Sequence, residues 1–278
     1  DLAESHPPVL KTHDRYGHRI DEVIYDPSYH ELMRTAVGLG LHGAPWSDPK
    51  PNPHLVRAAK MSVWGSVVAG HGCPISMTYA VVPALRVNPE LAARYEPLLS
   101  SSSYDPRVAA PLTKTGLLAG MSMTEKQGGS DVRANTTTAI AQADGSYRIT
   151  GHKWFTSAPM SDILLVLAQA PGGLSCFFLP RVLPDGTKNN MAIQRLTDKL
   201  GNHSNASGEV EYDNAVAWLV GEEGRGVATI IEMVNMTRLD CTIGSATGMR
   251  VGIQQAAHHA NYRSVFGAQL IDQPLMRN

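Results

Sequence analysis

The sequence predicts an α+β multidomain chain in which helical, β-rich and again helical segments follow one another. Apolar residues at helical spacing dominate the first third, short strand-like runs separated by turns fill the middle, and one long helical pattern returns near the end. These three observations divide the chain into domains over residues 1–112, 113–222 and 223–278.

The first domain is expected to be helical. Asn52 and Pro53 stand where the N-cap and the first turn of a helix would be, and the apolar residues that follow at helical spacing are Leu55, Ala59, Val63 and Val67. Gly72 and Pro74 then interrupt the pattern.

The middle domain is expected to form a compact β barrel or sandwich. Its predicted strands cover residues 117–123, 136–142, 147–150, 163–169, 174–179 and 209–212. The continuous apolar run at 163–167 indicates a strand buried on both faces, whereas the alternation at 209–212 is typical of a strand with one face at the surface.

The last domain begins with a helix predicted from Val227 to Tyr262, which spans more than ~50 Å at ~1.5 Å per residue. Its apolar positions need packing partners, and no second helix follows before Asn278. Either another chain completes a bundle around this helix, or the domain is incomplete. The glycines from Gly221 to Gly226 imitate a nucleotide-binding loop, but no βαβ unit surrounds them, so we interpret them as a hinge.

Composition restricts the function classes. The 24 basic and 25 acidic side chains give a formal net charge of -1, and no run of Lys or Arg offers a track for nucleic-acid phosphates. Cys73, Cys176 and Cys241 are far apart and odd in number, so we expect reduced, mostly buried thiols and no metal site.

Targeting signals are not evident. No apolar run approaches the ~18 residues of a membrane span, and Asp1 to His6 lack a secretory pattern. We therefore expect a cytoplasmic protein. Because the chain opens on Asp1 rather than Met, some N-terminal residues are expected to be missing.

Two segments indicate a ligand site. Residues 121–131 place small hydroxyls, the pair Gly128-Gly129 and an acid directly after an apolar strand, which predicts either an ordinary turn or a cradle for a polar ligand. Residues 151–157, Gly-His-Lys-Trp-Phe-Thr-Ser, place aromatic rings and two hydroxyls at the end of another strand. The combination is more specific than either segment alone.

Together these segments resemble the acyl-CoA dehydrogenases. Met-Thr-Glu-Lys-Gln-Gly-Gly-Ser-Asp-Val at 123–132, Gly-Gly-Leu-Ser-Cys-Phe-Phe at 172–178 and Lys-Leu-Gly-Asn-His-Ser-Asn-Ala-Ser at 199–207 are similar to the AidB-like branch of that family. The resemblance covers nearly the whole chain. It implies an N-terminal all-α domain, a middle β-barrel or sandwich domain and the first long helix of a C-terminal bundle that is truncated here.

The resemblance implies FAD as the cofactor. In the family, a carboxylate removes a proton beside the carbonyl of an acyl-CoA thioester while flavin N5 takes the hydride from the next carbon. The matching positions for the flavin ring are Met121, Met123, Thr124, Phe155 and Ser157, and those near the pyrophosphate are Gly129 and Ser130. Amide and hydroxyl donors near N1 and O2 would stabilise the negative charge of the reduced flavin.

Several residues of these segments also have structural interpretations. Phe155 and Trp154 could both be core aromatics. The motif favours flavin contact for Phe155, whereas strand alternation turns Trp154 to the opposite face and into the core. Glu125 and Asp131 imitate an acid/base couple, but the resemblance implies that they cap or brace the loop.

Arg263 begins an Arg-x-x-Phe-Gly segment similar to one in the family, where the arginine reaches the cofactor's pyrophosphate in a neighbouring subunit. A guanidinium fork suits this contact because it can donate two parallel hydrogen bonds. A homo-oligomer, dimer or tetramer, follows from this assignment; the alternative is a solvated charge near a helix end. Pro274 stands where the family has a glutamine, so we assign no adenine contact there.

The catalytic base is not evident. Most of the family places its glutamate beyond the position of Asn278, and a minority places it at the position of Thr237, which cannot act as this base. Asp240 shares a helix face with Thr237 and is a candidate substitute. The alternative is an acid paired with Arg238 or another charge.

Three functions stay open at this point. The first is an FAD-dependent acyl-CoA dehydrogenase that acts on an acyl-CoA-like small molecule. The second is an AidB-like flavoprotein of the DNA alkylation response, with DNA contact only through a missing C-terminal region. The third is a non-catalytic flavin-binding or assembly fragment. A flavin spectrum separates the third from the others, and salt-dependent retardation of duplex DNA separates the second from the first.

Overall fold

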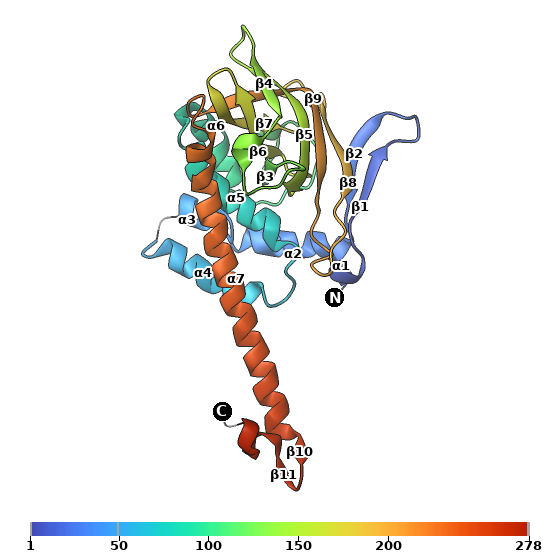
Figure 1. Ribbon diagram of the computed structural model, residues 1–278, viewed down its shortest axis with the longest axis vertical. Coiled ribbons are helices and arrows are strands. Elements are labelled where there is room, and N and C mark those ends of the chain that lie inside the picture. Colours follow the sequence, from blue (N-terminus) through green and yellow to red (C-terminus); the bar gives the residue numbers. More distant parts are fainter. Residues whose placement is uncertain (1, 49, 277–278) are drawn as a thin grey trace.

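A helical N-terminal region and a β barrel form the body of the molecule, and one long helix extends away from it (Figure 1). The computed structural model describes residues 2–48 and 50–276, so Asp1, Pro49, Arg277 and Asn278 lie outside the description. The predicted order of helical, β and helical segments is confirmed. Within the described residues, no helix combines the length and the apolar composition needed to cross a bilayer.

In its described residues, the N-terminal region contains six helices and, in addition to the prediction, a β hairpin. Its elements are α1 (Leu2–Ser5), β1 (Val9–His13), β2 (Arg19–Ile24), α2 (Pro27–Gly38), α3 (Ala44–Ser47), α4 (Pro53–Trp64), α5 (Gly72–Leu85) and α6 (Pro89–Leu99). Strands β1 and β2 are antiparallel, and β1 lies against a strand of the barrel. The hairpin therefore joins the N-terminal region to the middle domain.

Helix α4 begins at the predicted proline, but its apolar residues do not pack into the core. Asn52 occupies the N-cap position in the left-handed conformation and makes no side-chain cap bond. Leu55 and Val63 are 69% and 73% exposed, so the apolar series of this helix faces outward. The side chain that α4 buries is that of Arg57.

The middle domain is a closed barrel. Its strands are β3 (Ala119–Thr124), β4 (Thr138–Ala141), β5 (Tyr147–Ser157), β6 (Ile163–Ala170), β7 (Gly173–Pro180), β8 (Met191–Leu196) and β9 (Ser207–Val220). The pairings β3–β5, β5–β9, β9–β7, β7–β6 and β6–β3 complete a circuit, in which only β3–β6 is parallel. All six predicted strands are present, and β8 was not predicted.

Strand β6 separates two parts of the core. Every side chain from Ile163 to Ala168 is 0% exposed, which confirms the prediction of a strand buried on both faces. Leu165 and Leu167 pack with residues of α5 and α6, whereas Leu164 and Val166 pack inside the barrel. The barrel and the helices are therefore fixed against each other through one continuous strand.

Helix α7 (Gly226–Tyr262) starts at the barrel and continues far beyond it (Figure 1). A Cβ atom on Gly226 would lie 2.5 Å from the carbonyl carbon of Ser175, so a glycine is needed where the helix meets β7. Ile230 and Met233 are buried at this root, which contacts α5 and α4. The hinge interpretation of the preceding glycines fits this structure.

The far end of α7 carries a small hairpin. It consists of β10 (Ser264–Val265) and β11 (Ala268–Gln269), and the remaining short turns are η1 (Pro111–Thr113), η2 (Val132–Ala134), η3 (Leu270–Asp272) and η4 (Pro274–Met276). Phe266 and Gly267, with φ of 49° and 77°, form the two-residue connection. Positive φ at both positions is typical of a type I′ turn, which suits the twist of a hairpin.

Candidate functional site

The two segments that the sequence singled out lie side by side in the barrel. Strands β3 and β5 are antiparallel, with Met121 opposite Ser157 and Thr124 opposite Phe155. Met123 belongs to the same strand as Thr124, and Gly129 and Ser130 follow in the next turn. Five residues of these two strands form an outward surface, which we call the β3–β5 shelf: Met121, Met123, Thr124, Phe155 and Ser157.

The inner side of the shelf is held by buried hydroxyl groups. Ser122 and Thr156 lie opposite each other, and their side-chain oxygens are 2.6 Å apart. The phenol of Tyr212 donates a hydrogen bond of 2.9 Å to the Ser122 hydroxyl. Because all three side chains are at most 2% exposed, these bonds fix the two strands from inside the barrel.

A local irregularity turns two aromatic residues outward. The register of β5 against β9 shifts between Lys153 and Thr156, both of which are 0% exposed. Two residues therefore separate two inward side chains, as in a β-bulge, and both Trp154 and Phe155 are 41% exposed. The prediction that alternation places Trp154 in the core is wrong for this reason. Phe155 is also not a core residue.

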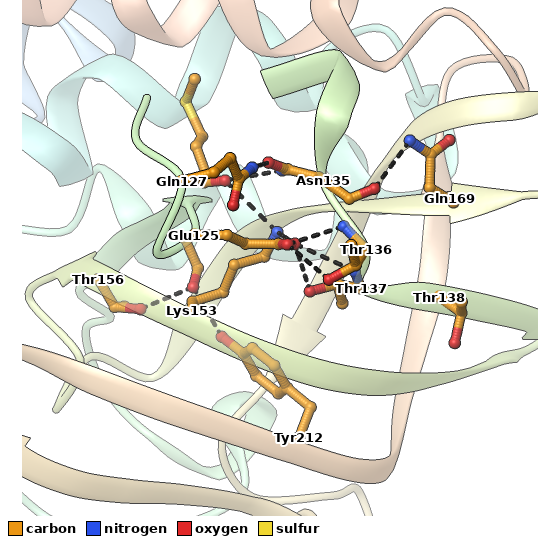
Figure 2. A network of polar contacts seen from close by, with 12 residues as sticks. Glu125, Gln127, Asn135, Thr136, Thr137, Thr138, Lys153, Thr156, Gln169 and Tyr212 are labelled. Carbon is orange, nitrogen blue, oxygen red and sulfur yellow. Dashed lines mark hydrogen bonds and ion pairs between the residues drawn. The ribbon is translucent and has the colours of Figure 1, made fainter. Parts of the chain in front are cut away.

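A buried ion pair fixes the turn that follows β3 (Figure 2). Glu125 is 3% exposed, and its Oε1 accepts a hydrogen bond of 2.8 Å from Nζ of Lys153. The same carboxylate accepts bonds from the backbone and hydroxyl groups of Thr136 and Thr137, at 2.6 to 3.1 Å. Glu125 thus braces the loop, as expected from the sequence, and ties it to the start of β4.

The electrostatics of Glu125 agree with a bracing function. Burial acts to raise the pKa of this carboxyl, but the hydrogen bonds from Lys153, Thr136 and Thr137 outweigh it and lower the pKa to about 2. The group is therefore ionised at neutral pH. A carboxylate with both oxygens engaged in this way has no free position for proton exchange with a substrate.

Amide side chains hold the rest of the loop. Asn135 Nδ2 donates 2.8 Å to the Met123 carbonyl and Gln127 Nε2 donates 3.0 Å to Asn135 Oδ1. Gln169 Nε2 donates to the carbonyl oxygens of Arg133 and Asn135. Figure 2 shows the bonds of Asn135 with Gln127 and Gln169 above the Glu125–Lys153 pair. The loop between β3 and β4 is thus connected to both neighbouring strands.

The glycine pair forms a turn whose outer side is open. Gly128 has φ of 107° and donates its amide to the Glu125 carbonyl at 2.9 Å. A Cβ atom on Gly129 would lie 2.9 Å from the Thr124 hydroxyl oxygen, so this glycine lets the loop approach the shelf. Asp131 is exposed, and its carboxylate makes no bracing contact within the described residues. The turn interpretation is confirmed; the cradle interpretation stays a prediction.

Arg263 and Asp240 lie away from the shelf. Arg263 follows the last residue of α7 and is exposed at its distant end (Figure 1). Asp240 forms a bidentate pair with Arg57 of α4, at 2.5 and 2.7 Å, and the two side chains are 7% and 2% exposed. The partner is not Arg238, but the structure favours the ion-pair alternative. A role as general base stays a prediction that this geometry disfavours.

Arg57 is itself held from two other directions. Its Nε donates 2.6 Å to the Leu41 carbonyl, and its guanidinium carbon lies 3.4 Å from the ring centre of Tyr79 on α5. The Arg57–Asp240 pair therefore joins α4, α5 and α7. Sequence reasoning missed this contact because its two ends are 183 residues apart.

A mainly apolar cavity of about 640 Å³ lies beside this ion pair, between α4, α5 and α7. Trp64 and Met77 line it from the N-terminal helices, and Thr237 and Gly244 line it from α7. A Cβ atom on Gly244 would meet nothing within 4 Å, so the glycine leaves space instead of allowing another helix to approach. The cavity was not predicted, although its size is typical of small-molecule sites.

The cysteines correspond only in part to the prediction. Cys73, Cys176 and Cys241 are all free, but only Cys176 is buried, while Cys73 is half-buried and Cys241 is exposed. Among the described residues, no group of His, Cys, Asp and Glu side chains could hold a metal ion.

Comparison with known proteins identifies the family of each part of the chain. Residues 1–106 match the family model of the adaptive response protein AidB N-terminal domain. Residues 120–215 and 224–278 match the middle and C-terminal domain models of the acyl-CoA dehydrogenases.

Among the curated relatives that match this chain, two cover nearly all of it. AidB of Escherichia coli K12 is 48% identical over 279 residues, which is 100% of this chain and 52% of the relative. Acyl-CoA dehydrogenase family member 11 of Caenorhabditis elegans is 31% identical over 287 residues, or 98% of this chain and 46% of the relative. The chain thus spans about half the length of these relatives.

Solved structures share the fold. The Caenorhabditis elegans protein ACDH-11, in complex with C11-CoA, superposes with a TM-score of 0.87 at 31% identity over 99% of this chain and 48% of that one. An acyl-CoA dehydrogenase of Bacillus anthracis complexed with FAD has a TM-score of 0.71 at 23% identity, over 90% and 41% of the two chains.

Proposed function

We propose, from the premise that this chain belongs to the acyl-CoA dehydrogenase family and to its AidB-like branch, that it supplies the FAD-binding half of an acyl-CoA dehydrogenase-like oxidoreductase. The observation that supports this most directly is the pairing of Thr124 with Phe155 on an outward surface. The Glu125–Lys153 pair holds that surface in place from the inner side. This chain spans about half the length of its relatives. We therefore propose the reaction for the whole protein and not for this chain alone.

The residues of the β3–β5 shelf fit a flavin. Phe155 offers a half-exposed ring, Thr124 offers a hydroxyl group opposite it, and Ser157 offers a second hydroxyl group further along the strand pair, opposite Met121. Gly128 has open space where a side chain would be, which leaves the loop backbone accessible to a phosphate. Met121 and Met123 would support the ring from below as adaptable apolar contacts.

The chain's own groups would orient and polarise the cofactor. Hydroxyl and amide donors of Thr124, Gly129 and Ser130 would stabilise negative charge, because preorganised dipoles in a fixed loop need no rearrangement. Bound FAD supplies the acceptance of a hydride at N5. Proton removal from the substrate needs a base that we do not assign to Asp240, since both of its oxygens are held by Arg57.

Arg263 would act on a second subunit. The helix that carries it leads away from the shelf of its own chain, so its guanidinium could reach a pyrophosphate only in another copy (Figure 1). This supports a homo-oligomer, dimer or tetramer, in which each FAD site is completed across an interface.

The cavity between α4, α5 and α7 would take the acyl part of an acyl-CoA-like substrate. Its lining is mainly apolar, and Thr237, which matches the base position of a minority of the family, faces it from α7. A cavity of about 640 Å³ has room for a chain of several methylene groups. Each methylene buried there would contribute ~0.8 kcal/mol to binding.

A flavin titration tests the proposal. Purified protein should show flavin absorbance or recover it with added FAD, and Phe155→Ala should weaken FAD binding about tenfold, which corresponds to ~1.4 kcal/mol. Tyr16→Ala removes a ring that is 69% exposed on the N-terminal hairpin and serves as the control. A colourless protein that does not take up FAD, or equal affinities for both variants, would contradict the assignment.

A further inference from the structure

A second cavity, of about 750 Å³, lies between the N-terminal region and the barrel, away from the shelf. Its walls are the end of β2 with α2, the connection around residues 104–118, and the ends of β6 and β7. We call it the Arg181 cavity, after the residue that follows β7. Ligand sites often form at such domain boundaries, since two rigid parts meet there without filling all the space.

Arg181 is a buried cation with most of its hydrogen-bond donors unused. It is 5% exposed, its Nη1 donates 3.0 Å to the Met160 carbonyl, and its Nη2 donates to the Asp21 carbonyl. A guanidinium has five N–H donors, so three are left without an acceptor in the described part of the chain. No carboxylate in that part lies within ion-pair distance. Burial lowers the pKa of this group, and the nearby carboxylates of Asp162, Asp21 and Glu22 only partly oppose that effect.

The buried carboxylate of the cavity is already engaged by other groups. Lys114 and Asp162, 3% and 9% exposed, form an ion pair of 2.5 Å, and the second oxygen of Asp162 accepts the Leu118 amide. Asp162 is therefore fully used by Lys114 and the backbone. Arg181 is a second buried cation of this cavity, and Asp162, Asp21 and Glu22 act on it across space without an ion-pair contact in the described residues. What Arg181 lacks is therefore a direct acceptor for its remaining N–H groups, which a bound carboxylate would supply.

Four other charges of the cavity compensate one another in pairs. Arg107 pairs with Asp105, whose side chain is 5% exposed, and Arg34 pairs with Glu31 near solvent. Glu22 lines the opening, half-buried and with no ion-pair partner in the described chain. The negative charge of Glu22 acts on Arg181 and would oppose the binding of an anion.

Aromatic rings line the space between mouth and base. Tyr25 and Tyr29 stack with ring centres 3.8 Å apart, and neither hydroxyl makes a hydrogen bond of normal geometry. His30 Nδ1 lies 2.8 Å from the Tyr104 hydroxyl on the opposite wall. Burial and Arg34 lower the pKa of His30, so this wall is neutral at pH 7. Such walls suit a flat or apolar molecular body.

We propose that the Arg181 cavity binds a small organic carboxylate, with its anionic group against Arg181 and Lys114 and its apolar body against the tyrosines. This binding does not depend on flavin or on the proposed dehydrogenation, because no residue of the β3–β5 shelf lines the cavity. The carboxylate would use the free donors of Arg181, for which a planar two-oxygen acceptor has the matching geometry.

Isothermal titration with three probes of one shape tests the charge requirement. Benzoate should bind saturably, while benzamide should bind at least tenfold more weakly and benzamidine should not bind. Inorganic phosphate, which lacks the apolar body, should also be weaker than benzoate. Benzamidine binding as well as benzoate, or phosphate binding better, would overturn the proposal.

Variants locate the site. Arg181→Gln should weaken benzoate binding at least tenfold, whereas Glu22→Gln should strengthen it two- to fivefold by removing a like charge from the mouth. Arg195→Gln, at an arginine that is 61% exposed on the barrel surface, is the matched control and should leave the affinity unchanged. If Arg181→Gln does not fold, Glu22→Gln decides alone: unchanged or weaker benzoate binding in that variant refutes the site.

Discussion

Two buried ion pairs, Glu125–Lys153 in the barrel and Arg57–Asp240 between helices, hold the two halves of the proposed site in different ways. Glu125 has five hydrogen-bond donors around it and joins residues at most 28 positions apart. Asp240 has one partner, 183 residues away. The first pair stabilises a loop within a domain, and the second fixes one domain against another. Removal of each should therefore produce damage of a different kind.

The largest effect is expected for Glu125→Ala. The substitution leaves Lys153 buried without a counter-charge and removes acceptors from Thr136 and Thr137, so the free energy of unfolding should fall by about 3–5 kcal/mol. Urea denaturation measures this loss. The double variant Glu125→Leu/Lys153→Met should lose less than Glu125→Ala, because no charge stays buried. An equal or greater loss would show that the pair is not the main interaction.

The pH dependence of stability isolates the contribution of Glu125. Burial acts to raise the pKa of Glu125, but its hydrogen bonds lower it to about 2, below the usual value of 4.5. A lowered folded-state pKa means that the stabilisation is complete above about pH 4.5 and is lost as the pH falls towards 2, by roughly 3 kcal/mol. The difference in unfolding free energy between the unsubstituted protein and Glu125→Ala should shrink by this amount between pH 5 and pH 2. A constant difference would contradict it.

Asp240→Asn should cost less, about 2 kcal/mol, because the amide keeps one acceptor for Arg57 while losing a charge-assisted bond. The loss of stability should be confined to the helices that the ion pair joins. Amide hydrogen exchange should accelerate at the root of α7 and in α4, with no change in β3 and β5. Asp131→Asn, at an exposed position, is the control and should change stability by less than ~0.5 kcal/mol. Faster exchange on the shelf would mean that the two regions are coupled.

The smallest effect is expected from the glycine turn. Gly128→Ala should cost about 1 kcal/mol, because alanine is strained at φ of 107°, although its methyl group meets no atom. Gly145→Ala imposes the same kind of strain, at φ of 79° in open space, in a turn remote from the shelf. Thermal unfolding should therefore shift similarly in both variants, while FAD affinity should fall only in Gly128→Ala. Equal FAD affinities would argue against a cradle in this loop.

The sequence predicted the elements whose pattern is local. The long final helix was placed within one residue of its observed start, since the glycines before it mark a boundary, and the strand at 163–170 followed from an unbroken apolar run. The hairpin of β1 and β2 was not predicted, because the apolar residues of its two strands, Val-Leu-Lys-Thr-His and Arg-Ile-Asp-Glu-Val-Ile, do not alternate with polar ones, although the burial of β1 does alternate. The domain limits at 112 and 222 stay predictions.

In the candidate site, too, local patterns were predicted and features that depend on distant contacts were not. The neighbouring positions of Thr124 and Phe155 followed from motif resemblance, and the structure pairs them across two strands. The outward direction of Trp154 did not follow, because a register shift in β5 depends on contacts with β9 that lie more than 50 residues away. Nor could the sequence reveal the pair of Arg57 with Asp240, since two single charges on separate helices carry no sign of their partner. Roles in cofactor binding stay proposals for every residue of the shelf.

Because helix α7 is long and is held near its start, a small change in its direction there produces a large displacement at its distant end. With 37 residues at ~1.5 Å each it is about 55 Å long, so a tilt of about 5° at its root would displace Arg263 by about 5 Å. This displacement is larger than the donor–acceptor distance of a hydrogen bond, about 3 Å. The bond between Ser62 and Thr247, 2.6 Å from oxygen to oxygen, lies roughly halfway along the shaft and would limit the swing together with Arg57. Arg263 at the distant end of α7 could thus reach the phosphate of a neighbouring subunit only if the start of the helix is held rigidly against the N-terminal helices.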